Sequence, residues 1–118
     1  MNGWREMAAV AALIAGSTTA VDAQDWNGAE QLIHGDYAGA ERIILAQQKQ
    51  FPGDVDLTLN LARVYAMTGR TVDAARLYRA AANAPNEELD MPNRRVAWSR
   101  DVAAEGLRRL PTPVAATR

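Results

Sequence analysis

The chain of 118 residues contains no cysteine, one histidine, one phenylalanine, three tyrosines and three tryptophans. Without cysteine, a disulfide framework, a thiolate metal site and a thiol nucleophile are excluded. A single histidine also excludes the ordinary histidine-based metal sites. Thirteen Lys and Arg side chains against 14 Asp and Glu give a net charge of −1. This balance creates no large field of one sign, so we expect no binding to nucleic acid.

Hydrophobic residues make up 48% of the chain, and many of them are alanine. Glycine-rich phosphate loops, nucleophile elbows and metal-binding helix motifs are absent from the sequence. We therefore predict a helical protein that is not an enzyme and that uses no cofactor and no metal.

The first 23 residues differ from the rest and have the layout of a secretory signal peptide. A short polar start carries Arg5, an uninterrupted apolar run covers Met7 to Ala15, and small residues lead to Ala23. Glu6 offsets the charge of Arg5, and the alternative is an alanine-rich helix that packs on the domain. The apolar run is shorter than the ~20 residues that a bilayer span needs. We expect cleavage near Ala23, a periplasmic or secreted mature protein, and no membrane association after cleavage.

A pattern of glycine, alanine, arginine and apolar residues recurs 34 positions later in the chain. The matched pairs are Gly35 with Gly69, Ala40 with Ala74, Arg42 with Arg76, and Ile44 with Tyr78. A turn that contains proline closes each unit, at residues 51–53 and 84–86. Each unit is therefore predicted to be a helix, a tight glycine turn and a second helix.

The second unit carries the complete pattern. Asp54 is a candidate N-cap for a helix that begins at Val55, and Thr71 is one for the helix after the Gly69 turn. Helical spacing places the apolar residues of each helix on one face. These are Leu57, Leu61, Val64 and Tyr65 in the first helix, and Ala74, Leu77, Tyr78 and Ala81 in the second. In the earlier unit, Asp36 is the cap, and Tyr37, Ala40, Ile44 and Phe51 share a side.

The segment Leu61-Ala62-x-x-Tyr65-x-x-x-Gly69-x-x-x-x-Ala74-x-x-x-Tyr78-x-x-Ala81 resembles the tetratricopeptide repeat. Residues 27–86 would hold about one and a half to two such units. The fold implied is all-α, a short array of helical hairpins with the winding of an α-α superhelix. Asn27 and Gln31 replace the leucine and the aromatic residue that the family has in its first helix, so this helix is expected to be short or loosely packed.

Residues 87–110 do not continue the repeat. Leu89 and Met91, and then Val96 and Trp98, alternate with other residues around the turn signal Pro92-Asn93. This alternation predicts a short β-hairpin; the alternative is one long helix that starts at Pro92.

The last predicted helix, from Arg100 to Leu110, has Ser99 as its expected cap and Gly106 in its interior. It would cap the apolar side of the second unit, which a second copy of the chain could cover instead as a homodimer. The tail, residues 111–118, is expected to be disordered.

Isolated polar residues offer little chemistry. His34 lies next to Gly35 at a predicted helix end, where a cation interacts well with the helix dipole. Asp54 and Asp56 lack the other ligands of a calcium loop. The acidic run Glu87, Glu88 and Asp90 is expected to be solvated.

The resemblance implies a function in binding proteins, because stacked first helices of tetratricopeptide repeats line a concave groove for a peptide or helix. Arg63 would pair with a carboxylate, and Leu59 and Met67 would offer apolar contact or pack on the last helix. The groove positions implied are Asp56, Leu59, Arg63, Ala66 and Met67 in the second unit, with Leu32 and Ile33 in the first. The expected function is an exported adaptor that binds a segment of another envelope protein; the alternative is a structural homo-oligomer.

Overall fold

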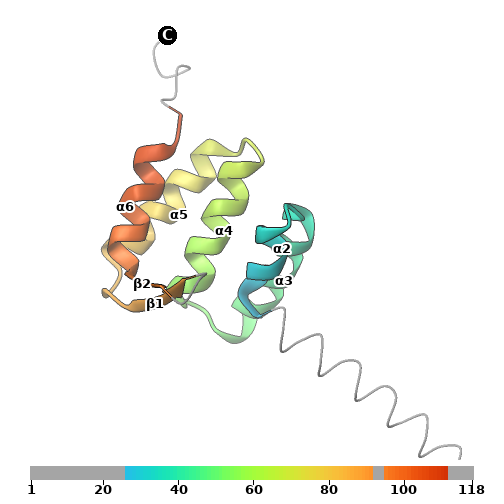
Figure 1. The fold of residues 1–118 in the computed structure, drawn as a ribbon, viewed down its shortest axis with the longest axis horizontal. Helices are drawn as coiled ribbons and strands as arrows, with labels where there is room; N and C mark the ends of the chain where they lie inside the picture. Colours follow the sequence, from blue (N-terminus) through green and yellow to red (C-terminus); the bar gives the residue numbers. More distant parts are fainter. Residues whose placement is uncertain (1–25, 92–94, 112–118) are drawn as a thin grey trace, which may run out of the picture.

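The computed structural model describes residues 26–91 and 95–111. The predicted signal peptide and almost all of the predicted tail lie outside the described residues. The described part of the chain is mostly helical and carries one small two-stranded sheet (Figure 1). Its elements are the 3₁₀ helix η1 (Trp26–Gly28), α2 (Ala29–Ile33), α3 (Tyr37–Gln50), α4 (Val55–Met67), α5 (Thr71–Asn83), β1 (Glu88–Met91), β2 (Arg95–Trp98) and α6 (Ser99–Arg109).

The two repeat glycines lie at the bends between consecutive helices. Gly35 connects α2 to α3 with a φ of 79°, and Gly69 connects α4 to α5 with a φ of 81°. Residues with a side chain rarely adopt this left-handed backbone conformation, whereas glycine does so without steric cost. The predicted helix–glycine–helix order of both units is therefore confirmed.

Of the three N-caps predicted in the repeat units, two are confirmed and one is wrong. Asp36 accepts a hydrogen bond from the Gly39 amide at 2.9 Å, and Asp54 accepts one from Leu57 at 3.0 Å. Thr71, in contrast, is the first residue of α5, and the N-cap is Arg70, which makes no side-chain cap bond. The Arg70 side chain extends toward α3 instead, where it pairs with Glu41.

The first helix is short, as the departures from the repeat pattern predict. α2 has five residues, none of them buried. Asn27 and Gly28, just before it, have φ values of 57° and 72°, so the backbone is left-handed at two successive positions. A helix cannot continue through such a pair, which limits α2 to the residues that follow.

The core lies on both sides of α4, which is the central helix. On the side toward α3, its buried residues pack with Ala40 and Ile44. On the side toward α5 and α6, they pack with Ala74, Tyr78 and Ala103. The predicted apolar face of α4 is therefore confirmed, but it accounts only for the side toward α3. The buried α4 residues on the side toward α3 are Leu57, Leu61 and Val64. Those on the side toward α5 and α6 are Val55, Leu59 and Ala62. Phe51, which was expected on the apolar side of α3, is 45% exposed, because it lies after the helix at its C-cap.

Residues 88–91 and 95–98 pair as the two strands of the predicted β-hairpin, so the alternative of one long helix is wrong, while the predicted turn at Pro92-Asn93 lies outside the described residues. β1 and β2 are antiparallel, with Glu88 opposite Trp98 and Met91 opposite Arg95. Leu89 is 8% exposed and belongs to the core between α4, α5 and α6. The hairpin thus closes one end of the helical layer.

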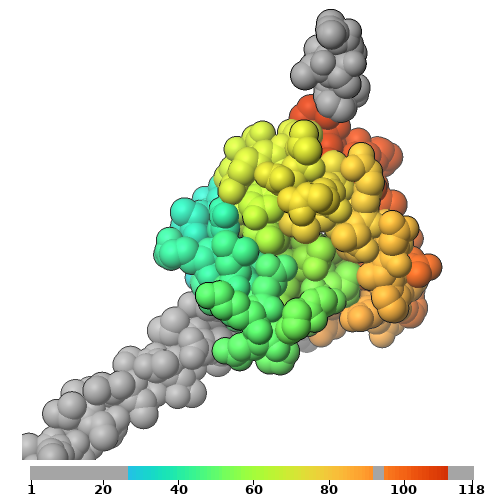
Figure 2. Space-filling view, turned by 180° about the vertical axis from the view of Figure 1, so that it is seen from behind, coloured from blue at the N-terminus to red at the C-terminus, as the bar shows by residue number. Residues whose placement is uncertain are grey.

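α6 packs against α5 and α4 and covers the apolar side of the second unit (Figure 1). Seen from behind, α3 and α5 lie in front, and α6 is visible only at the rim beyond α5 (Figure 2). Gly106 allows this approach, because a Cβ atom there would overlap the ring of Tyr78.

The predicted cap of α6 is wrong. Ser99 is the first residue of the helix and fully buried, and its hydroxyl accepts a hydrogen bond from the Glu87 amide at 2.8 Å. The side chain of Asn86 binds the α6 terminus, because its Oδ1 accepts from the Arg100 amide at 3.0 Å.

Candidate functional site

A hollow of about 660 Å³ lies between α4 and α6 and ends at the hairpin. We call it the α4–α6 groove. α4 and α6 run in the same direction, away from the hairpin, so they form its two long walls (Figure 1). α4 contributes Leu59, Asn60, Arg63, Ala66 and Met67; α5 contributes Tyr78; the hairpin contributes Met91 and Ala97; and α6 and its end contribute Asp101, Val102, Glu105, Gly106, Arg109, Leu110 and Pro111.

Four of the seven predicted groove residues line this hollow. Leu59 is 4% exposed and forms part of its base, since it belongs to the core. Met67 is 52% exposed and lies at the end far from the hairpin. Arg63 and Ala66 lie between them on α4. The predicted wall on the second unit is therefore assembled, with α6 facing it.

The other three predicted residues do not line the groove. The carboxylate of Asp56 accepts a hydrogen bond from the Asn27 side chain and is half-buried. Leu32 packs against the core between α3 and α4, and Ile33 is 62% exposed on α2. The first unit contributes no wall because it packs on the side of α4 that faces away from α6.

The groove has an apolar base and charged edges. On α6, Glu105 accepts hydrogen bonds from Arg108 and from Arg109, the latter at 2.6 Å. These bonds lower the pKa of Glu105 to about 2, so it is ionised and already paired. Opposite Glu105, the side chain of Arg63 makes no ion pair or hydrogen bond within residues 26–91 and 95–111. The same holds for the exposed side chain of Asp101. One cation and one anion thus remain available to a ligand.

Tyr78 lies under the groove, 7% exposed, where α5 passes beneath α4 and α6. Burial raises the pKa of its hydroxyl, although the positive charges of Arg63 and Arg109 oppose the shift. The phenol therefore stays neutral at physiological pH and offers a ligand an aromatic surface rather than a charge.

Most of the lining residues that sequence reasoning missed belong to the facing wall, and the exceptions are Asn60 of α4 and Tyr78 of α5. Val102 and Leu110 come from α6 and its end, and Met91 and Ala97 come from the hairpin. The helical spacing of apolar residues over 99–110 predicts that α6 packs on the second unit. Which of its residues would remain open to solvent depends on the angle at which it packs, and no pattern in the sequence gives that angle.

Residues 26–91 and 95–111 carry neither a metal-binding cluster nor a membrane-spanning helix. Within them, no three His, Asp or Glu side chains gather in a way that could hold a metal ion. None of their helices has the length and hydrophobicity to cross a membrane. Searches of family models, of curated proteins and of solved structures each find no match to this chain.

Proposed function

We propose that this chain is a small protein-interaction module, related in architecture to the tetratricopeptide repeat, that binds a peptide or helix of another protein in the α4–α6 groove. The observation that carries the proposal is an open apolar hollow with Arg63 at its edge, whose side chain has no ion-pair partner among the described residues. A peptide that buries apolar side chains over the base of the groove and against the exposed Met67 could direct a carboxylate to Arg63.

Two further features support an adaptor. The sequence of residues 1–23 favours export, so the partner would be another envelope or secreted protein. Met67 is flexible and exposed, and methionine adapts its shape to different apolar side chains. We propose no catalytic step, since the groove holds no nucleophile oriented by a base.

The test has two stages. Affinity capture with the full chain from an envelope extract would first provide a partner, and the binding segment of that partner would then be titrated. We expect Arg63→Ala to weaken binding about tenfold or more, as for a lost charge-assisted hydrogen bond. Arg79→Ala is the matched control, because Arg79 is exposed on α5 and does not line the groove. Equal affinities of the two variants would refute this groove as the binding site.

Self-association is the second candidate function. The exposed Met67 at the groove end and the nearly balanced charge of the chain both favour contact between copies. Sedimentation at several concentrations separates the two functions. A monomer throughout removes the homo-oligomer, whereas a dimer that Met67→Ser dissociates would favour it over the adaptor.

A further inference from the structure

The outward face of the β-hairpin carries large apolar side chains where a solvated sheet normally carries polar ones. Val96 is 56% exposed and Trp98 is 47% exposed, both on β2. They alternate with Arg95 and Ala97, of which Ala97 lines the groove on the inner side. In antiparallel sheets with one solvated face, the apolar residues ordinarily point inward. β2 reverses this arrangement and exposes its larger apolar residues.

β1 has the ordinary arrangement, and this places acids beside the apolar pair. Leu89 and Met91 pack inward, whereas Glu88 and Asp90 are exposed. In the register, Glu88 lies directly opposite Trp98, and Asp90 lies directly opposite Val96. Such cross-strand neighbours on one face have Cβ atoms about 5 Å apart, so each carboxylate lies beside an apolar side chain.

The acids of this face are unpaired and lie near further acids. Among the described residues, Glu88 and Asp90 make no ion pair or side-chain hydrogen bond. The charges of Asp90, Glu87 and Asp54 also act together on Asp56 at the start of α4. Several acids therefore gather near this face, although the chain as a whole is nearly neutral, and Arg95 of β2 belongs to the opposite face of the hairpin.

We propose that the hairpin outer face, formed by Glu88, Asp90, Val96 and Trp98, is a second docking surface that binds a lysine- or arginine-containing segment of another protein. The ammonium or guanidinium group would lie between the carboxylates and the Trp98 ring, where a cation gains both ion pairing and cation–π attraction. The alkyl stem of the same side chain, or an alternating apolar residue, would cover Val96.

Charge complementarity selects this occupant over the others. An anionic membrane surface would be repelled by the exposed carboxylates, and a copy of the same hairpin face would bring like charges together. A cationic segment is the partner for which the acids and the apolar residues act in the same direction. None of these four residues lines the α4–α6 groove, so the proposal goes beyond the proposed function.

The test uses the full chain and two synthetic hexapeptides, one of alternating lysine and valine and one of alternating glutamate and valine. The reporter is the NMR signal of the Trp98 indole N–H, which Trp98→Phe assigns among the three tryptophans. We expect the lysine peptide to shift this signal saturably and to bind more weakly as salt is added, because the pairs are exposed. The glutamate peptide should leave the signal unchanged.

Two sets of variants test the two contributions separately. Glu88→Gln together with Asp90→Asn should weaken binding about fivefold by removing the ion pairs. Val96→Thr, which keeps the β-branched shape, should weaken it about twofold by removing apolar contact. Glu30→Gln, an exposed acid on α2, is the matched control and should not change the affinity.

Several results would overturn the proposal. These are equal binding of the two peptides, an unchanged affinity in the Glu88→Gln/Asp90→Asn variant, and a Trp98 shift produced by neutral phosphatidylcholine vesicles rather than by the lysine peptide. Self-association that Val96→Thr abolishes would identify a second copy as the occupant and overturn it too. Arg63→Ala should not affect the peptide titration, so failure here and failure of the groove are distinguishable.

Discussion

The two helical hairpins of this protein are held together in different ways. In the first, η1 with α2 and α3, the apolar packing of Ala40 and Ile44 on α4 is supplemented by polar contacts of Asn27. Asn27 donates its backbone N–H to Gln47 Oε1 at 2.8 Å and its side-chain amide to Asp56, while its carbonyl accepts from Asn60 at 2.9 Å. The second, α4 and α5, is held by close apolar packing that continues into α6. Polar contacts thus supplement packing at η1 and α2, where the repeat pattern is weakest and α2 has no buried residue.

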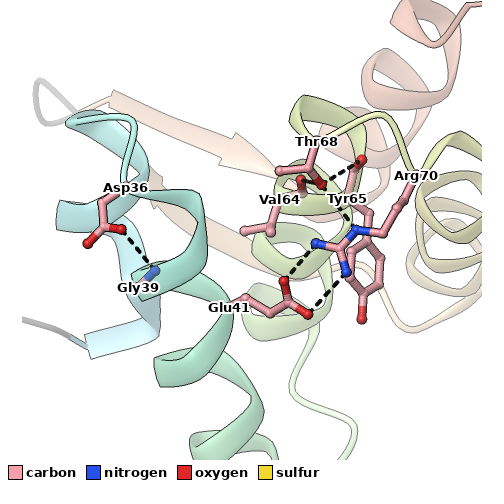
Figure 3. A network of polar contacts seen from close by, with 7 residues as sticks. All are labelled: Asp36, Gly39, Glu41, Val64, Tyr65, Thr68 and Arg70. Atoms are coloured by element: carbon pink, nitrogen blue, oxygen red, sulfur yellow. Dashed lines mark hydrogen bonds and ion pairs between the residues drawn. The ribbon is translucent and has the colours of Figure 1, made fainter.

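A surface clamp also connects the two hairpins (Figure 3). Arg70, at the start of α5, donates two hydrogen bonds to Glu41 of α3, at 2.7 and 3.2 Å. Its guanidinium lies 4.4 Å from the centre of the Tyr65 ring on α4, and its Nε donates to the Thr68 hydroxyl at 3.1 Å. One arginine at the start of α5 therefore contacts both α3 and α4.

The largest expected effect comes from truncating a core residue of the second hairpin. Leu59→Ala removes apolar atoms from a site that is 4% exposed and surrounded by α5, α6 and the hairpin. We expect a loss of about 2–5 kcal/mol in the free energy of unfolding, measured by urea denaturation. Leu32 in the first hairpin is half-buried, so Leu32→Ala should lower the free energy of unfolding markedly less. Equal losses would mean that both hairpins depend equally on apolar packing.

A smaller effect is expected from adding one methyl group at a glycine. Gly106→Ala improves helix propensity, yet its Cβ would overlap the Tyr78 ring, so we expect a net loss of about 1–3 kcal/mol. The methyl group of Gly35→Ala would meet no atom within 4 Å, so this substitution creates no overlap. Its cost, about 1 kcal/mol, comes from the positive φ alone. Thermal unfolding of both variants compares them. If Gly106→Ala is the more stable one, α6 is not closely packed.

The smallest expected effect is a pH dependence of the clamp. The hydrogen bond from Arg70 lowers the pKa of Glu41 below its ordinary value of 4.5. Its stabilisation is therefore complete above pH 4.5 and is lost as the pH falls through the folded-state pKa. Glu41→Gln should flatten this acid-side decline in urea midpoints, by a small amount because the pair is exposed.

Asp56 provides the opposite sign at the same junction. Burial raises its pKa, with a smaller opposing effect from the Asn27 hydrogen bond. The ionised form is therefore less favourable in the folded state, and this cost is relieved as the pH falls through the raised pKa. Asp56→Asn should consequently steepen the acid-side decline, whereas Glu41→Gln reduces it. Parallel shifts in both variants would contradict the assigned causes.

Local structure was largely predictable, because its causes are local in the chain. Asp36 and Asp54 cap helices through amides three residues away, and Gly35 and Gly69 supply the left-handed turns. The hairpin also followed from the alternation of its residues. The caps of α5 and α6 were not predictable. At α6, the Ser99 hydroxyl accepts a hydrogen bond from the Glu87 amide, and the Asn86 side chain, which precedes the hairpin in the chain, accepts the one from the Arg100 amide.

The candidate site was predictable only by half. Helical spacing places Leu59, Arg63, Ala66 and Met67 along α4, and the structure keeps all four on the groove. Asp56 does not line the groove and instead accepts a hydrogen bond from the side chain of Asn27, which lies 29 positions earlier in the sequence. Leu32 and Ile33 were lost because α2 ends the row of first helices instead of extending it.

The sequence by itself determined the glycine turns, the starts of α3 and α4 and the apolar spacing of the helices, because these features act over a few residues. Tertiary structure alone decided that α4 is buried on two sides, that Gly106 admits the Tyr78 ring, and that α6 with the hairpin forms the second wall of the groove. The reason is physical. These features depend on how closely and at what angle helices meet, and that follows from the packing of all their side chains together.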